Sequence, residues 1–311
     1  MNTGKSMTII IPCYNEANNI RLMASELEKV FSDLPYRWEM LFIDDGSTDC
    51  TLKILTEIVL QTSSLRYISL SRNFGKEAAL KAGYDHARGD AVISLDADLQ
   101  HPPAIIPEMI RLWEEGYEVV CTQRAEDRSL PWMKRATSKL FYQLLNKFCS
   151  INLCYGVSDF RLLDRSVVDI IKMLPEKDLF FRGIVKWTGF RQTSIDYYPN
   201  KRLHGMSKYN LSKLLILAID SIISFSIRPL YYMVFLGLMF TCLSLAYIPY
   251  LVYCLLFNYA LSTWISILAT AFLLGGLHLS ITGLVGVYAG KSYEQAKQRP
   301  QYIIGRSSFE L

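Results

Sequence analysis

The first third of the chain alternates short apolar runs with segments in which apolar residues recur every three or four positions. The short runs have the length of strands and lie at residues 7–12, 38–43, 65–70 and 92–95. Helical patterns follow the first three of them, at residues 20–30, 51–59 and 76–86. Because strand, polar loop and helix repeat in this order, we predict an α/β fold with a doubly wound, mostly parallel sheet.

The fourth predicted strand ends in two carboxylates, Asp96 and Asp98, and Pro102 and Pro103 prevent it from continuing. Ligands of open α/β sheets bind outside the carboxyl ends of the strands. Carboxylate oxygens there suit Mg²⁺ or Mn²⁺, and such an ion usually shares its shell with substrate phosphates. We therefore interpret the pair as a clamp for a metal ion and a diphosphate, although isolated pairs of this kind more often cap helices or close turns.

A second acidic pair, Asp44 and Asp45, follows the predicted strand at 38–43. At the ligand-binding edge of the sheet, such carboxylates can accept hydrogen bonds from the ribose or the base of a nucleotide. The alternative is that they cap the helix that follows. The pattern alone leaves both interpretations open.

Basic residues gather after a fifth predicted strand at 118–122, with Trp132 among them. They are Arg124, Arg128, Lys134 and Arg135. Basic and aromatic residues together fit a helix that lies in a membrane interface, and a charged solvated face is the alternative. A later loop at 202–209 contains a glycine and several side chains suited to phosphate oxygens. They are Arg202, Ser207 and Lys208.

Two long stretches without charge follow, at residues 229–257 and 264–290. Each exceeds the roughly 20 residues that cross a bilayer core, and a pair of buried core helices is the alternative. Basic residues precede the first stretch and follow the second but are absent between them, which orients both ends toward the cytoplasm. We therefore predict a catalytic domain at 1–210, an interfacial helix at 211–228, a transmembrane hairpin at 229–290 and a cytoplasmic tail at 291–311.

Composition limits the class of protein. The 311 residues carry a net charge of +4, which is too small to indicate a nucleic-acid partner. Seven cysteines without a C-x-x-C pair indicate reduced thiols in a protein that faces the cytosol. The short polar N-terminus leads directly into a strand and does not have the pattern of a signal peptide.

Four motifs in fixed order resemble those of the inverting GT-A glycosyltransferases of family 2. The closest resemblance is to the polyprenyl-phosphate hexosyltransferases, the group that includes dolichol-phosphate mannose synthase and the bactoprenol glucosyltransferases. The resemblance extends over nearly the whole chain, because the later segments match as well. The motifs are IPCYNE at 11–16, FIDDGSTD at 42–49, RNFGK at 72–76 and LDADLQHP at 95–102.

This resemblance implies the transfer of a hexose from UDP-glucose to undecaprenyl phosphate at the cytoplasmic face of a bacterial inner membrane. The acceptor phosphate would attack the anomeric carbon and invert it, with Mg²⁺ or Mn²⁺ as cofactor. Asp98 and Asp159 would be the catalytic acids. A homo-oligomer is expected as well, with a tetramer as the form that the resemblance implies, and the glycines of the second apolar stretch fit close helix contacts.

The resemblance also assigns the binding residues. The metal ligands would be Asp96, Asp98 and Gln100. The nucleotide sugar would contact Pro12, Tyr14, Asn15, Glu16, Asp44, Asp45, Lys76, Asp96 and Gln100. The acceptor and its phosphate would contact Arg124, Arg135, Arg202, Ser207 and Lys208.

Three alternatives stay open. The sugar can be mannose, N-acetylglucosamine or a modified arabinose, and the acceptor can be another lipid such as diacylglycerol or ceramide. A processive polysaccharide synthase shares the early motifs but is expected to carry a Gln-x-x-Arg-Trp element, which this sequence lacks. A catalytically silent membrane scaffold would have little reason to keep both acidic motifs and the loop at 202–209.

Overall fold

The computed structural model describes residues 4–124, 157–176, 180–198, 230–236 and 263–310, together with a few positions between 239 and 257. The chain forms two compact units. The first comprises Met1–Asn146, Ile151–Leu214 and Pro300–Leu311, and the second comprises Lys147–Ser150 and Leu215–Arg299.

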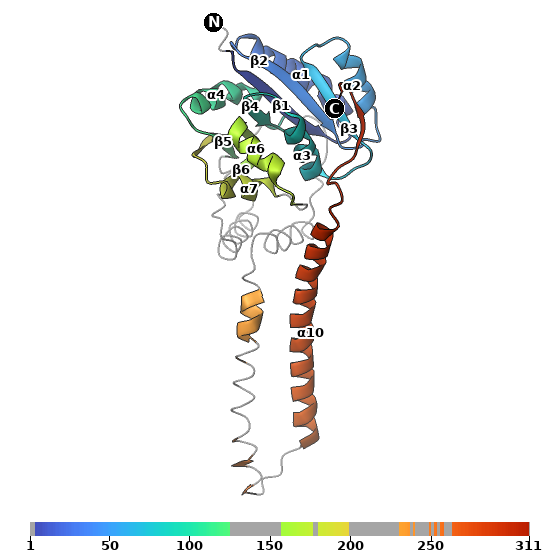
Figure 1. Ribbon diagram of the computed structural model, residues 1–311, viewed down its shortest axis with the longest axis vertical. Helices are drawn as coiled ribbons and strands as arrows, with labels where there is room; N and C mark the ends of the chain where they lie inside the picture. The colour runs from blue at the N-terminus through green and yellow to red at the C-terminus, as the bar shows by residue number, and fades with distance from the viewer. Residues whose placement is uncertain are drawn as a thin grey trace. The chain divides into compact units, whose positions relative to one another are not determined.

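The first unit is built on an eight-stranded sheet in the order β7-β5-β6-β4-β1-β2-β3-β8 (Figure 1). In chain order the strands are β1 (Ser6–Cys13), β2 (Arg37–Asp44), β3 (Leu65–Leu70), β4 (Ala91–Ser94), β5 (Val119–Arg124), β6 (Val157–Asp164), β7 (Gln192–Tyr197) and β8 (Ile304–Ser307). The four strands predicted from the apolar runs are β1 to β4, and they lie parallel in the order β4-β1-β2-β3. This half of the sheet confirms the prediction.

The other half makes the sheet mixed, and the sheet stays mostly parallel, as predicted, because β5 and β7 also form a parallel pair. β6 runs antiparallel between β4 and β5, and β8 runs antiparallel to β3 at the far edge. The predicted strand at 118–122 exists as β5, but it does not lie beside β4. The apolar pattern did not predict β6, because Asp159 and Arg161 interrupt it, and the burial of these two charges depends on ion pairs that form only in the folded protein.

Helices flank this sheet, and the three predicted early helices are confirmed. They are α1 (Ala17–Ser32), α2 (Thr51–Val59) and α3 (Lys76–His86). Further along are a 3₁₀ turn, η1 (Pro103–Ile105), and the helices α4 (Ile106–Glu114), α6 (Arg165–Met173) and α7 (Phe181–Trp187). α1 packs beside α2, whereas α3 packs on β1 and β2 and against α6.

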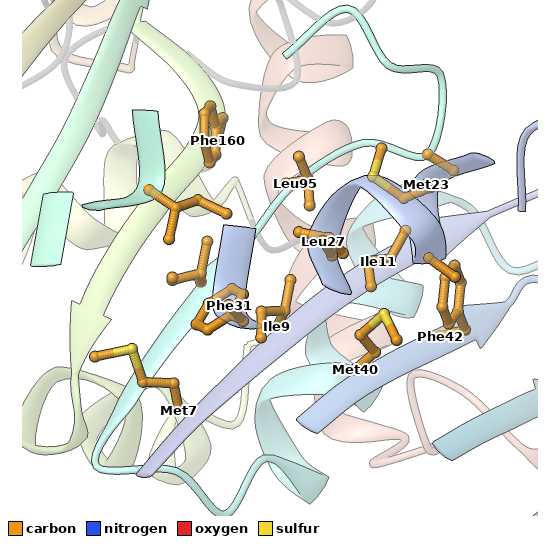
Figure 2. Packing of buried hydrophobic residues seen from close by; sticks show 14 of the residues in the cluster. Met7, Ile9, Ile11, Met23, Leu27, Phe31, Met40, Phe42, Leu95 and Phe160 are labelled. Carbon is orange, nitrogen blue, oxygen red and sulfur yellow. The ribbon is translucent and has the colours of Figure 1, made fainter. Parts of the chain in front are cut away.

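The hydrophobic core follows the side-chain alternation of β1 (Figure 2). Ile9 and Ile11 point to one face and belong to the same buried cluster as Leu27 of α1. Ile10 points to the opposite face, where a Cβ added to Gly83 of α3 would lie 2.3 Å from Ile10 Cγ2. β1 is thus buried on both faces, which explains why its residues are almost continuously apolar.

The C-terminal residues return to the first unit, where β8 extends the sheet beside β3. The Tyr302 hydroxyl donates to Asp85 Oδ2 at 2.9 Å, and the Arg66 guanidinium lies 3.6 Å from the centre of the Phe309 ring. The segment predicted as a tail therefore supplies an edge strand that is anchored by side-chain contacts.

The longest described element of the second unit is α10 (Thr263–Ala296), which spans the predicted apolar stretch at 264–290. Within the part of the chain that the structure describes, no helix combines the length and the apolar character that crossing a membrane requires. The predicted interfacial helix at 211–228 lies outside the described residues, and so does most of the stretch at 229–257.

Candidate active site

A lysine and two carboxylates from three elements meet at the carboxyl end of β4. Lys76 is the first residue of α3, Asp96 follows β4, and Asp159 lies on β6. Lys76 Nζ lies 2.6 Å from Asp96 Oδ1 and 2.9 Å from Asp159 Oδ2. One ammonium group therefore bridges two acids that the sequence analysis had singled out separately.

Two arginines surround the same Asp159 carboxylate. Arg161 Nη2 donates to Oδ1 at 2.8 Å, and Arg182 of α7 donates through Nε to Oδ1 and through Nη2 to Oδ2, each at 3.0 Å. Burial favours the neutral acid, but Lys76, Arg182 and Arg161 together hold the pKa of Asp159 well below its usual range. An ionised carboxylate with a lowered pKa is a weak base, so this geometry favours an orienting role over proton abstraction.

Asp96 is held through both of its oxygens. Oδ1 contacts Lys76, and Oδ2 lies 3.5 Å from His101 Nε2. Burial would raise the pKa of Asp96, but the Lys76 charge and the hydrogen bond from His101 hold it below its usual range. Asp96 is therefore an anion at neutral pH, in a fixed orientation.

Asp98 and Gln100 lie on the tight turn that follows. The Gln100 N–H donates to Asp98 Oδ1 at 3.2 Å, and Leu99 between them has a φ of 59°, a left-handed conformation that is uncommon for a leucine. Gln100 Oε1 lies 3.4 Å from Arg124 Nη2. Arg124, which is predicted to contact a phosphate, therefore lies beside the turn. Within the described ranges, no group of three or more His, Cys, Asp or Glu side chains is placed to hold a metal ion.

The donor chemistry of this turn nevertheless fits the predicted cofactor. Asp96, Asp98 and Gln100 offer only oxygen ligands, which Mg²⁺ and Mn²⁺ prefer over soft donors. Such ions usually bind through one or two carboxylates and complete their shell with water and substrate phosphates. A site with few protein ligands is therefore what a metal that binds together with a diphosphate requires.

Asp45, which directly follows β2, connects the loop after β2 to the residues just before α3. Its carboxylate accepts the N–H groups of Phe74 at 2.7 Å and Gly75 at 2.9 Å. Burial raises the pKa of Asp45, and these two hydrogen bonds oppose the rise. The carboxylate thus fixes the RNFGK loop that places Lys76.

Asp44 is also bound within the protein. It accepts the Ser47 N–H at 3.0 Å and the Ser69 hydroxyl of β3 at 2.8 Å. Neither acid caps α2, whose N-cap position is Cys50, so the helix-capping alternative for this pair is wrong. Contact of either acid with a nucleotide stays a prediction.

The loop after β1 is joined to the loop after β2. The Asn15 N–H donates to Ser47 Oγ at 2.9 Å, and Asn15 Oδ1 accepts the Thr48 N–H at 2.8 Å. Asn15 has a φ of 56°, a conformation that asparagine tolerates better than most residues. The other nucleotide-side candidates of this loop, at the end of β1 and just after it, are Pro12, Tyr14 and Glu16.

Gly46→Ala is expected to destabilise the protein by about 2 kcal/mol or more. Gly46 has a φ of 65°, and a Cβ there would lie 2.3 Å from the backbone carbon of Arg72, so the loops after β2 and β3 would have to separate. Urea unfolding of the full chain measures the loss. Gly189→Ala is the matched control, because Gly189 has a φ of 74° but no atom of the described residues lies within 4 Å of the added Cβ, and its cost is expected to be about 1 kcal/mol.

Glu77, which the sequence analysis did not single out, lies in the same electrostatic environment. Burial and the Asp159 charge raise its pKa to about 7, against the charges of Lys76, Arg161 and Arg182. Within the described residues, Glu77 Oε2 is buried without a hydrogen-bond partner. Because its folded pKa lies above the ordinary value of 4.5, the folded state binds the proton more tightly, and stability falls as pH rises from about 4.5 to 7.

Glu77→Gln is therefore expected to reduce this pH dependence and to make the variant more stable than the wild type above about pH 7. Urea unfolding of both proteins at about pH 5 and about pH 8 measures the effect. If the unfolding free energy changes by the same amount in both proteins between these pH values, Glu77 is ionised in the native state throughout.

Some of the predicted site residues lie outside the described part of the chain, and two arginines of the site were not predicted. Arg135, Arg202, Ser207 and Lys208 lie outside the described residues. Arg161 could have been found from its spacing, since it follows Asp159 by two residues and so shares its face of β6. Arg182 could not, because only the packing of α7 on β6 brings it to Asp159.

The chain matches the family model for glycosyl transferase family 2 over residues 8–171, a range that includes the lysine and carboxylates of the cluster. It is 39% identical over 299 residues to an uncharacterized glycosyltransferase of Synechocystis sp., covering 96% of this chain and 94% of the relative. It is 37% identical over 302 residues to the SfII prophage-derived bactoprenol glucosyl transferase of Shigella flexneri, covering 97% and 98%. A crystal structure of glucosyl-3-phosphoglycerate synthase from Mycobacterium tuberculosis with Mn²⁺, uridine diphosphate and glucosyl-3-phosphoglycerate aligns with a TM-score of 0.48 at 20% identity, covering 71% of this chain and 79% of that one.

Proposed function

Because the chain belongs to glycosyl transferase family 2, we propose that it transfers a hexose from a UDP-sugar to a polyprenyl phosphate. The observation that carries the proposal is the cluster in which Lys76 bridges Asp96 and Asp159 at the carboxyl end of β4. The acceptor class is supported by relatives that match nearly the whole chain and are named bactoprenol glucosyl transferase.

The proposed reaction needs no covalent enzyme intermediate. An oxygen of the acceptor phosphate forms a bond to the anomeric carbon, while the bond from that carbon to the UDP oxygen breaks and its electron pair leaves with UDP. A phosphate monoester has a second pKa of about 6, so the acceptor is largely ionised at neutral pH and no base has to remove a proton. Attack from the face opposite UDP inverts the anomeric configuration.

The residues of the cluster have distinct parts in this scheme. Asp159 orients sugar hydroxyls, and Arg182, whose side chain is 35% exposed, can reach the acceptor phosphate. Asp98, Asp96 and Gln100 would hold the divalent metal, which when bound neutralises charge on the diphosphate. Arg124 lies beside this turn and can contact the same diphosphate.

We propose glucose as the sugar, undecaprenyl phosphate as the acceptor and the cytoplasmic face of a bacterial inner membrane as the location. The uncharged stretches within 229–290 and the basic residues that flank them support a membrane hairpin. A cysteine placed at Ala260, between the stretches, is expected to react with an impermeant maleimide on intact cells. The exposed native Cys50 is expected to react only after permeabilisation. A homo-oligomer stays a prediction.

The proposal is tested with the detergent-purified full chain, undecaprenyl phosphate, Mn²⁺ or Mg²⁺, and a panel of radiolabelled nucleotide sugars. Label that enters the organic phase from UDP-glucose alone, and not in the presence of a chelator, supports the proposal in full. Label from another donor, or transfer only to diacylglycerol or ceramide, corrects the substrate and keeps the reaction class. Failure to bind any UDP-sugar in the presence of Mg²⁺ would favour the silent scaffold, whereas binding without lipid-linked product would favour another acceptor or a polymerising role.

A further inference from the structure

A line of polar side chains connects Arg124 on β5 with Asp96. Arg124 Nε donates to Tyr197 Oη at 3.2 Å, and Tyr197 Oη lies 2.7 Å from His101 Nδ1. His101 Nε2 in turn lies 3.5 Å from Asp96 Oδ2. The two middle residues are inside the protein, with His101 1% and Tyr197 3% exposed. This line therefore runs through the interior from a cation to the turn that carries the acidic motif.

The two charged ends of the line set the direction of its hydrogen bonds. A guanidinium can only donate, so the Tyr197 oxygen accepts from Arg124. A carboxylate can only accept, so an imidazole with one N–H carries it on Nε2, the nitrogen that faces Asp96, and its Nδ1 accepts the Tyr197 hydroxyl proton. All donors point from the cation toward the anion, and hydrogen bonds aligned in this way polarise and strengthen one another.

Aromatic packing fixes the imidazole in this position. The His101 ring centre lies 5.5 Å from that of Phe160 and 5.5 Å from that of Tyr197. Phe160 is the neighbour of Asp159 on β6, and Tyr197 ends β7. Two strands, β6 and β7, thus hold one ring against rotation, which is more support than a histidine that merely fills space requires.

We propose that Tyr197 and His101 are positioning residues that hold Asp96 in the orientation in which the donor diphosphate binds. They act through Asp96 and do not touch the substrate. The inference rests on the proposed function, since the diphosphate is that of the UDP-sugar. Without this support, Lys76 is the ion-pair partner of Asp96 that is left among the described residues, and the carboxylate can turn about its side-chain bonds.

Tyr197→Phe tests the inference because it removes only the hydroxyl and keeps the ring contacts with His101 and Phe160. We expect the affinity for UDP in the presence of Mn²⁺, measured by calorimetry, to fall by about tenfold or more. The thermal midpoint of the full chain is expected to change little. Tyr67→Phe is the matched control, because Tyr67 is also a buried sheet tyrosine, its hydroxyl contacts Thr56 of α2, and its strand, β3, lies far from β7 in the strand order of the sheet. Its UDP affinity is expected to equal that of the wild type.

A second pair of variants separates positioning from packing. His101→Gln keeps an N–H near the place of Nε2 and is expected to retain more UDP affinity than His101→Leu, which has no donor. When His101→Leu is combined with Tyr197→Phe, the affinity for UDP is expected to fall little further, because both substitutions interrupt the same line of hydrogen bonds.

The inference is overturned if Tyr197→Phe lowers the thermal midpoint but leaves UDP affinity unchanged, or if His101→Gln and His101→Leu bind UDP equally. Absence of UDP binding by the wild type overturns it together with the proposed function. A wild type that binds UDP but transfers no sugar to polyprenyl phosphate overturns the proposed function alone, and the comparison of UDP affinities still decides the role of Tyr197 and His101.

Discussion

Asp98→Ala is expected to lower sugar transfer by about a hundredfold or more while the protein keeps its fold. The change removes a carboxylate from the turn after β4, where charge on the leaving diphosphate has to be neutralised. Asp98 is only half-buried and belongs to no part of the hydrophobic core, so the loss is chemical. The hydrogen bond that Asp98 accepts from the Gln100 N–H is worth about 1 kcal/mol of stability.

The measurement compares the initial rate of label transfer for the variant and the wild type, with the circular dichroism spectrum and thermal midpoint of each. Asp33→Ala is the matched control, since it removes an exposed aspartate after α1, and its rate is expected to stay within about twofold. Undiminished turnover in Asp98→Ala would place the metal and diphosphate elsewhere in the molecule.

Asp159→Asn is expected to lose both activity and stability. The Arg161 side chain is 1% exposed and depends on Asp159 for charge compensation, because within the described residues its Nε and Nη1 have no hydrogen-bond partner. An asparagine leaves that guanidinium buried and uncompensated, which is expected to cost about 3–5 kcal/mol. Lys76 and Arg182 lose the same partner, so the cluster also changes its charge where the sugar would bind.

The stability loss has a definite pH dependence. The pKa of Asp159 is lowered in the folded state, so its contribution is present above the unfolded value of about 4 and is lost as pH falls below it. The difference in unfolding free energy between wild type and variant is therefore expected to be largest near pH 7 and to shrink toward about pH 3, measured by urea unfolding. Asp169→Asn, which breaks an exposed pair with Arg165, is expected to cost no more than about 1 kcal/mol. A difference that stays constant across this pH range would mean that the cluster does not depend on the Asp159 charge.

The sequence predicted the part of the fold that depends on local hydrophobic pattern. β1 is buried on both faces and therefore continuously apolar, so its position and its parallel neighbours could be predicted. β6 could not, because the buried charges of Asp159 and Arg161 are stable only in the ion-pair cluster of the folded protein. The antiparallel position of β6 between β4 and β5 depends on tertiary packing, which the local spacing of apolar residues does not indicate.

The same distinction applies to the candidate site. The acids at the ends of β2 and β4 were predicted because polar residues at a strand's carboxyl end are visible in the sequence. The bridge from Lys76 to Asp159 was not, since it joins α3 to β6 across the sheet. Arg182 and Tyr197 likewise come from α7 and β7, whose positions depend on the fold of the whole unit.

The most direct test determines the anomeric configuration and the mass of the lipid product formed by the purified full chain from UDP-glucose and undecaprenyl phosphate. We predict a lipid phosphate that carries one added hexose, with the anomeric configuration opposite to that of the donor. A product that keeps the donor's configuration would contradict direct attack by the acceptor phosphate, and the absence of any lipid-linked sugar would contradict the proposed reaction itself.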